Sequence, residues 1–164
     1  MTAALAPLVL RRAFGTFPTG VTALAALVGT KPVGLAVSSF TSVSLEPPMV
    51  LVCVAHASTT WPILSNVPRI GISVLAADQE RVCRQLSAPV DDRFAGLDWQ
   101  ATDGGSVLLG GASAWFDCSI AQRWRAGDHD IVVLEVHDIE IDATNATAPL
   151  VFHASRVRAL RPDR

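Results

Sequence analysis

The sequence lacks several features that assign a protein to a common functional class. Its three cysteines, Cys53, Cys83 and Cys118, show no C-x-x-C spacing, so we interpret them as buried thiols rather than as a disulfide or a zinc site. The net charge of −2 predicts no basic surface for nucleic acid. No apolar run reaches the roughly 18 residues that a membrane span needs. We therefore expect no metal, no nucleic acid and no membrane association.

A targeting segment is also missing from the sequence. The N-terminal residues show no basic region followed by a long apolar stretch and a cleavage site, which favours a cytoplasmic location. Hydrophobic residues make up 50% of the chain and charged residues 17%, which is a high apolar content for a monomer. We therefore expect a homo-oligomer that buries apolar surface between subunits. The length of 164 residues predicts one domain over 1–164.

The familiar catalytic motifs are absent as well. There is no G-x-S-x-G nucleophile turn, no H-E-x-x-H zinc motif and no Walker A phosphate loop. The four histidines show no ligand-like spacing. A chain without an obvious nucleophile or metal cage is a candidate for cofactor chemistry, in which the protein mostly binds and orients.

Hydrophobic patterning predicts a mainly β chain. Apolar stretches indicate strands, two of which form a hairpin around Gly29-Thr30. The expected strands are residues 21–28, 32–37, 49–54, 70–75, 114–120 and 131–142. The stretches 49–54 and 70–75 are apolar enough to be buried on both faces. Because helices do not alternate regularly with strands, the pattern favours an antiparallel barrel.

A few short helices and one irregularity complete the predicted elements. Apolar residues at helical spacing over 5–17 predict an amphipathic helix that packs on another surface. Ser58 to Pro62 predict a helix start, and Asp78 is expected to cap a further helix. Residues 88–111 are expected to be mostly loop. At Asp138 the apolar alternation slips by one residue, which predicts a β-bulge.

The segment from Ser38 to Pro48 is the most informative part of the chain. It is rich in hydroxyl side chains, contains Phe40 and ends in two prolines. Hydroxyls compete for local backbone hydrogen bonds and prolines remove donors, so this composition suits neither a helix nor a dry core. We interpret the segment as a turn that presents N–H and O–H groups to a flat ligand with polar edges. The alternative is an ordinary Ser/Thr turn beside prolines.

Several motifs occur together in an order that resembles the flavin reductase-like family. They are Phe17-Pro-Thr-Gly-Val-Thr22, Ser38-Ser-Phe-Thr-Ser-Val-Ser-Leu-Glu-Pro-Pro48, Ser73-Val-Leu-Ala-Ala-Asp-Gln79, Asp92-Arg-Phe94 and Ala126-Gly-Asp-His129. The resemblance covers about residues 8–160. It implies a split β-barrel of the FMN-binding, Greek-key antiparallel type and a homodimer with flavin near its interface. The implied activity is an NAD(P)H:flavin oxidoreductase, with NADH favoured, that supplies reduced FMN or FAD to a partner monooxygenase.

The resemblance also implies the residues that hold the flavin. Backbone N–H groups and hydroxyls of 37–40 suit the polar edge of the isoalloxazine ring. Hydroxyls at the predicted helix start suit the flavin phosphate, because free N–H groups and the helix dipole favour an anion there, although ordinary capping is the alternative. The predicted flavin contacts are Thr19, Val37, Ser38, Ser39, Phe40, Ser44, Ala55, Ser58, Thr59, Thr60 and Phe94.

The Gly127-Asp128-His129 turn matches the family motif whose histidine faces the nicotinamide. The resemblance implies that His129 positions NAD(P)H, whereas the turn by itself favours a solvated histidine. Hydride transfer needs the two rings stacked at roughly 3–3.5 Å and no protein base, so we expect His129 to affect hydride-donor binding. Asp92-Arg93-Phe94 is either a wall of the pocket or a solvated charge pair followed by an anchoring aromatic. The tail after His153 departs from the family pattern.

Two other functions compete with a reductase. A non-catalytic flavin-binding or electron-carrier protein would use the same barrel without turnover. A pyridoxamine-phosphate oxidase-like enzyme shares the barrel as well, but it needs a basic phosphate site, and the sequence around Ser58 does not predict one because His56 and Ala57 precede that serine.

Overall fold

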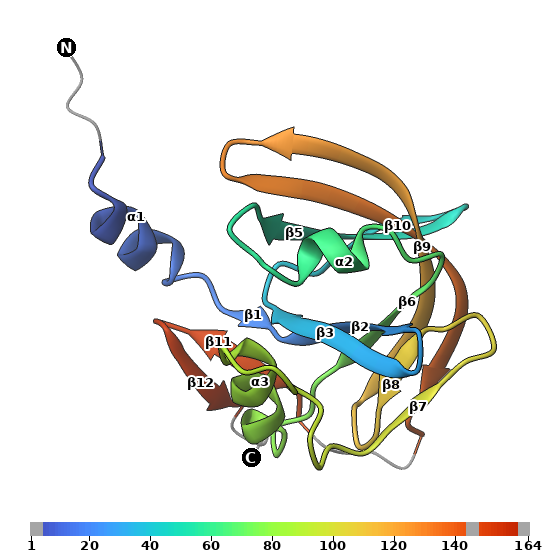
Figure 1. Ribbon diagram of the computed structural model, residues 1–164. Coiled ribbons are helices and arrows are strands. Elements are labelled where there is room, and N and C mark those ends of the chain that lie inside the picture. Colours follow the sequence, from blue (N-terminus) through green and yellow to red (C-terminus); the bar gives the residue numbers. More distant parts are fainter. Residues whose placement is uncertain (1–4, 144–147, 161–164) are drawn as a thin grey trace.

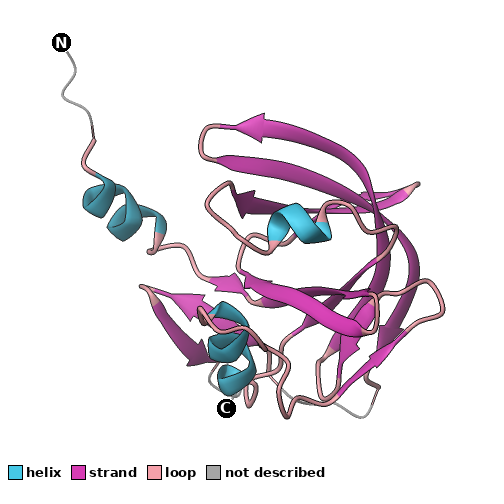
Figure 2. Cartoon of the chain, in the orientation of Figure 1, coloured by secondary structure: helices cyan, strands magenta, loops and turns pink. Residues whose placement is uncertain are grey.

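The computed structural model describes residues 5–143 and 148–160 and is mainly β, as predicted (Figures 1 and 2). Its helices are α1 (Pro7–Phe14), α2 (Trp61–Leu64) and α3 (Glu80–Ser87). The strands that build the main sheet are β2 (Thr22–Val28), β3 (Lys31–Val37), β4 (Thr41–Leu45), β5 (Pro48–Ala55), β6 (Ile70–Val74), β9 (Ala114–Ala126) and β10 (His129–Ile141). The remaining strands are β1 (Thr19–Gly20), β7 (Trp99–Ala101), β8 (Val107–Leu109), β11 (Leu150–His153) and β12 (Arg156–Ala159).

The main sheet has seven antiparallel strands in the order β3-β2-β6-β9-β10-β5-β4. The sheet is strongly curved, and α2 lies across its opening (Figure 2). Within the described residues β3 and β4 form its two edges and do not pair with each other. The predicted antiparallel barrel is therefore confirmed in its split form. Smaller sheets, β1-β11-β12 and β7-β8, extend the structure at one end.

Two hydrophobic clusters hold the curved sheet in place. The first fills its concave side with residues such as Leu24, Ile72 and Leu134, all fully buried, and is closed by Leu64 of α2. The second lies on the other face of β2 and includes Leu86 of α3. Burying each such leucine contributes about 1.5–3 kcal/mol relative to exposure. Because β2 alternates its side chains between the two clusters, its position relative to α2 and α3 is fixed from both faces.

Most predicted strands are confirmed, and their differences have local causes. The 29–30 hairpin is present, with Gly29 at φ 64° joining β2 to β3. Strand β5 is buried on one face only, so the prediction of burial on both faces was wrong there, whereas β6 is buried along nearly its whole length. A register shift between Val136 and Asp138 confirms the predicted bulge. A second shift, between Val133 and Leu134, was not predicted.

The hydroxyl-rich segment is a strand in its second half. Residues Thr41–Leu45 form β4, which pairs with β5 across a bulge between Ser42 and Ser44. As an edge strand, β4 places its polar side chains at the surface, which is why a composition typical of turns is tolerated. The prediction of a continuous turn was therefore wrong beyond Phe40.

The helices are shorter than predicted or begin elsewhere. Helix α1 ends at Phe14, none of its described residues is buried, and it stands away from the rest of the chain (Figure 1). Helix α3 begins after Gln79, so Asp78 does not cap it. The predicted loop 88–111 contains the β7–β8 hairpin. No helix in the described ranges is long and apolar enough to cross a membrane.

Candidate functional site

The loop that follows β3 is fixed to the middle of β5. The Ser39 hydroxyl donates to the carbonyl of Cys53 at 2.9 Å and accepts the backbone N–H of Cys53 at 2.8 Å. The Phe40 ring packs on the first core cluster, with its centroid 5.7 Å from that of Phe116. The fold thus uses the Ser39 hydroxyl and the Phe40 ring. What this loop offers a ligand is its backbone and the exposed Ser38.

Beside this loop lies a small cavity of about 160 Å³. It is lined by Val21, Ala36, Val37, Ser38, Cys83, Ser87 and Phe152. Thr19 lies directly opposite Phe152 in the β1–β11 pair, and its Oγ1 atom is buried without a hydrogen-bond partner in the described structure. Buried hydroxyls are nearly always hydrogen-bonded, so this atom indicates a missing polar partner. An orphaned hydroxyl beside an apolar cavity fits a flavin, which is flat, apolar on its faces and polar at its edge.

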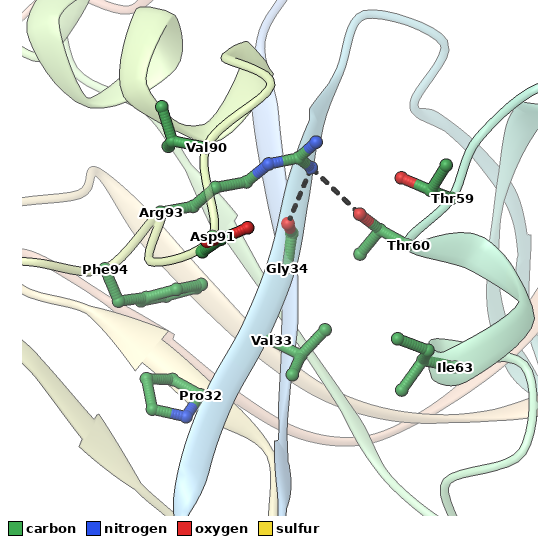
Figure 3. Close-up of a pocket in the computed structure, with 10 residues that line it drawn as sticks. All are labelled: Pro32, Val33, Gly34, Thr59, Thr60, Ile63, Val90, Asp91, Arg93 and Phe94. Atoms are coloured by element: carbon green, nitrogen blue, oxygen red, sulfur yellow. Dashed lines mark hydrogen bonds between the residues drawn. The ribbon is translucent and has the colours of Figure 1, made fainter.

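A second, larger cavity of about 270 Å³ lies between β3, α2 and the loop after α3 (Figure 3). Thr59 and Thr60 line one side, Arg93 and Phe94 the other, and Gly34 its floor. A Cβ on Gly34 would lie 2.5 Å from the Leu24 carbonyl and 2.9 Å from the Phe94 ring, so only glycine fits here.

Arg93 is the basic side chain among the described residues that line this second cavity, which the Asp91 carboxylate also lines. Its Nη1 donates to Thr60 Oγ1 at 2.9 Å and to the Gly34 carbonyl at 3.3 Å, and its Nε donates to the Ala88 carbonyl at 2.9 Å (Figure 3). All of these partners are neutral. Across residues 5–143 and 148–160 no carboxylate forms an ion pair with Arg93. A half-buried guanidinium held by neutral oxygens is a suitable partner for an anion such as phosphate, because its N–H groups can bind two of the phosphate oxygens together.

The helix start at Ser58–Thr60 is built differently from the prediction. Ser58 Oγ accepts the backbone N–H of Trp61 at 3.1 Å, so this hydroxyl caps α2. Thr60 uses its hydroxyl for Arg93 instead. Helix α2 has only four residues, too few for a substantial dipole. A phosphate bound at this place would therefore be compensated by Arg93 and the threonine hydroxyls rather than by the helix end.

The Gly127 turn presents His129 at the start of β10. Gly127 has φ 64°, which glycine adopts without strain, and His129 pairs with Ala55 at the end of β5. Nδ1 of His129 lies 2.7 Å from Oδ1 of Asp128, and this hydrogen bond lowers the pKa of the Asp128 carboxyl. The His129 side chain is 44% exposed. Nδ1 is therefore committed to Asp128, and Nε2 remains available to a ligand.

The structure separates the predicted contacts into several places. Thr59, Thr60 and Phe94 share the larger cavity, although Phe94 is 4% exposed and belongs to the second core cluster. Val37 and Ser38 line the smaller cavity. Ser44 lies on edge strand β4 opposite Met49 and lines neither cavity.

The cysteines are free thiols. Burial raises the pKa of Cys118 to about 12, and burial together with the charge of Glu80 raises that of Cys83. Both therefore stay protonated at neutral pH and do not serve as nucleophiles. Cys83 contributes surface to the smaller cavity.

Arg93 is the residue that sequence reasoning missed. It was interpreted as a solvated cation or as part of a wall, but the turn around Asp92 aims it at Thr60, a residue far away in the sequence. Its position next to Phe94, a core anchor, was the one available signal. Because Arg93 supplies a basic group at this cavity, the lack of a basic residue around Ser58 does not exclude a pyridoxamine-phosphate oxidase-like enzyme.

The comparisons converge on one family. Residues 14–161 match the flavin reductase like domain. A Pseudomonas putida protein named "Flavin reductase" is 36% identical over 151 residues, which are 92% of this chain and 88% of that protein. A Streptomyces globisporus "NADH-dependent FAD reductase" is 39% identical over 94% of this chain and 86% of its own length. A Rhizobium meliloti "Probable flavin reductase" is 41% identical over 85% of this chain, which spans only 45% of that longer protein.

Solved structures show the same fold. The Streptomyces globisporus NADH:FAD oxidoreductase SgcE6, solved in complex with NAD and FAD fragments, superposes with a TM-score of 0.88 and 38% identity, covering 95% of this chain and 93% of that one. Nitrilotriacetate monooxygenase component B from Mycobacterium thermoresistibile gives a TM-score of 0.91 with 32% identity, covering 94% and 87%. With a family match over nearly all of its residues and a shared fold, this chain belongs to the flavin reductase-like family.

Proposed function

We propose that this chain is an NADH:flavin oxidoreductase that reduces FMN or FAD and delivers the reduced flavin to a flavin-dependent monooxygenase. The family match and the names of the similar proteins, which include monooxygenase reductase subunits, support this activity. Within the structure the proposal rests on one observation. Arg93, without a carboxylate partner in the described residues, meets Thr60 in a cavity of a size suited to a phosphate and its ribityl chain.

The residues divide the work of binding between the two cavities. We infer that backbone groups of Val37 and Ser38, with the Thr19 hydroxyl, hold the polar edge of the ring, and that Arg93, Thr59 and Thr60 hold the phosphate. When bound, the flavin accepts a hydride from the reduced nicotinamide. That step needs no acid or base from the protein, so the residues of this chain act by positioning and by compensating charge.

His129 is suited to the nicotinamide side of the site. With Nδ1–H donated to Asp128, Nε2 is the ring nitrogen that faces a ligand, and in the neutral form of the ring it is a hydrogen-bond acceptor. A carboxamide N–H group of the nicotinamide is a matching donor. Asp128 thus selects the tautomer and the orientation of His129, and His129 in turn orients the hydride donor.

Turnover separates a reductase from an electron carrier. With a trace of the chain and a large excess of FMN and NADH under anaerobic conditions, a reductase bleaches the flavin absorbance many times over. A carrier bleaches at most one equivalent of flavin per chain. We expect the first result, and stoichiometric bleaching would refute the proposed activity.

We also propose a homodimer in which α1 packs on the second copy. The exposed apolar side chains of and after this helix support it, since Leu8 is 68% exposed and Phe14 and Phe17 are each 72% exposed. An isolated amphipathic helix of eight residues is not stable without such packing. Sedimentation equilibrium should return twice the chain mass of 17.4 kDa. A monomer at micromolar concentration would contradict the proposal. A single domain over 1–164 and a cytoplasmic location stay predictions.

A further inference from the structure

A carboxylate just after His129 connects three elements of the chain. Oδ1 of Asp130 accepts a hydrogen bond from His56 Nε2 at 2.8 Å, and Oδ2 accepts one from the Trp61 indole N–H at 3.3 Å. Arg123 on β9 approaches the same Oδ2 at 3.9 Å. Asp130 therefore joins the loop after β5, the first residue of α2 and the β9–β10 hairpin.

The same loop also binds the residue before His129. The backbone N–H of His56 donates to the carbonyl of Asp128 at 2.9 Å, while its side chain reaches Asp130. His56 therefore contacts both chain neighbours of His129, and Ala55 lies opposite His129 itself. The start of β10 cannot shift along β5 without breaking these contacts.

Asp130 and His129 point to opposite faces of the strand. Successive side chains in a β-strand alternate, so the Asp130 carboxylate cannot touch a ligand that His129 contacts. Its own face is the inner one, where Val54 and Val132 belong to the core and where Trp61 is 4% exposed. The His56 hydrogen bond is the first cause of a lowered pKa of the Asp130 carboxyl, which is therefore ionised at neutral pH. Arg125, the residue opposite Asp130 on β9, adds a second positive charge nearby.

We propose that the His56–Asp130 pair is a positioning unit that fixes the His129 turn for binding of the hydride donor. The inference rests on the proposed function, in which His129 contacts the nicotinamide. The phosphate side of the flavin site lies in the same loop but has contacts of its own, since Arg93 donates to Thr60 and Gly34 and Ser58 accepts the Trp61 N–H. Loss of the pair should therefore weaken NADH binding and leave flavin binding nearly unchanged.

The test replaces His56 and uses His137, on the β9–β10 hairpin, as the control. His56→Leu removes the side-chain bond to Asp130 and should raise the KM for NADH roughly 5-fold. The kcat and the FMN Kd should stay within about twofold. A 5-fold change in KM is typical of residues that act without touching the ligand. His137→Leu is the control. His137 makes a comparable 2.7 Å bond to Ser119 between β9 and β10, but far along the strand from His129, and its loss should leave the KM unchanged.

A conservative variant separates positioning from general damage. His56→Gln keeps an N–H donor within reach of Asp130 and should restore the KM for NADH to within about twofold of the wild type. Trp61→Phe removes the indole N–H together with part of a buried ring, and it should raise the KM for NADH about 2-fold. This variant carries the test if His56→Leu does not fold, a point that thermal unfolding monitored by circular dichroism decides.

The outcomes distinguish failure of the positioning role of His56 and Asp130 from failure of the proposed reductase activity. A wild-type chain that fails to reduce flavin with NADH refutes the proposed function. An active wild type in which His56→Leu and His137→Leu give the same KM overturns the inference alone. A parallel loss of FMN affinity and NADH affinity in His56→Leu also overturns it, because the pair would then maintain the whole site rather than the His129 turn.

Discussion

Arg93→Met should raise the Kd of FMN about 30-fold and leave that of riboflavin within about twofold, since a charge-assisted hydrogen bond contributes about 1.5–3 kcal/mol. The reason is the position of the guanidinium, which meets Thr60 and has no carboxylate partner among the described residues. Riboflavin lacks the phosphate and should not sense the change. Titration of the quenching of flavin fluorescence measures both affinities.

Two further variants make the Arg93 prediction specific. Arg93→Lys keeps the charge but loses the planar fork, so we expect about a 5-fold loss of FMN affinity. Thr60→Val removes the hydroxyl that accepts from Nη1 of Arg93 and should also lower the FMN affinity about 5-fold. If Arg93→Met weakens FMN and riboflavin equally, the arginine only braces the loop through Ala88 and Gly34, and the phosphate binds elsewhere.

His129→Ala should raise the KM for NADH about 10-fold and leave the FMN Kd within about twofold, as expected for the loss of one or two ligand hydrogen bonds. The side chain is half-exposed at a turn, so its removal should not disturb the core. Steady-state rates at saturating FMN give the KM, and fluorescence titration gives the flavin affinity.

Asp128 provides the matched variant for His129. Asp128→Asn keeps a side chain of the same size but removes the charge that holds Nδ1–H, and Asp128 is fully exposed, so folding should be unaffected. We expect a rise in the KM for NADH of about 3-fold, smaller than that of His129→Ala, because orientation is weakened rather than abolished. A selective loss of FMN affinity in His129→Ala would place this histidine on the flavin instead of the nicotinamide.

The strands could be predicted because their causes are local. Alternation of apolar and polar residues predicted β10, and the slip at Asp138 marked a real bulge. Where tertiary position overrides composition, prediction failed. The polar stretch at Thr41–Leu45 is a strand because the exposed edge beside β5 tolerates hydroxyls. The β7–β8 hairpin has only three residues per strand, too few for a clear pattern.

The sequence predicted which segments form the site but not the hydrogen-bond partner of each side chain. Ordered motifs indicated the loop at Ser38, the loop at Ser58 and the turn at His129. Which hydroxyl does what depends on neighbours far away in sequence. The Ser39 hydroxyl is hydrogen-bonded to the backbone of Cys53, and the Ser58 hydroxyl accepts the first N–H of α2.

Contacts between residues far apart in the sequence could not be predicted either. Arg93 meets Thr60 across 33 positions of the sequence, and His56 meets Asp130 across 74. No periodicity in the sequence connects such pairs. They arise because the fold brings the loop after α3 and the start of β10 to the residues around α2.

The steady-state rate of flavin reduction with NADH, measured for FMN, FAD and riboflavin under anaerobic conditions, shows whether this chain is a flavin reductase with a phosphate site. If Arg93 and Thr60 form a phosphate site of a flavin reductase, the kcat/KM for FMN or FAD should exceed that for riboflavin by about 10-fold or more, as loss of a charged partner implies. NADH should be preferred to NADPH. Equal rates for riboflavin and FMN would exclude a phosphate site at Arg93, and no turnover with either nicotinamide would exclude the reductase activity.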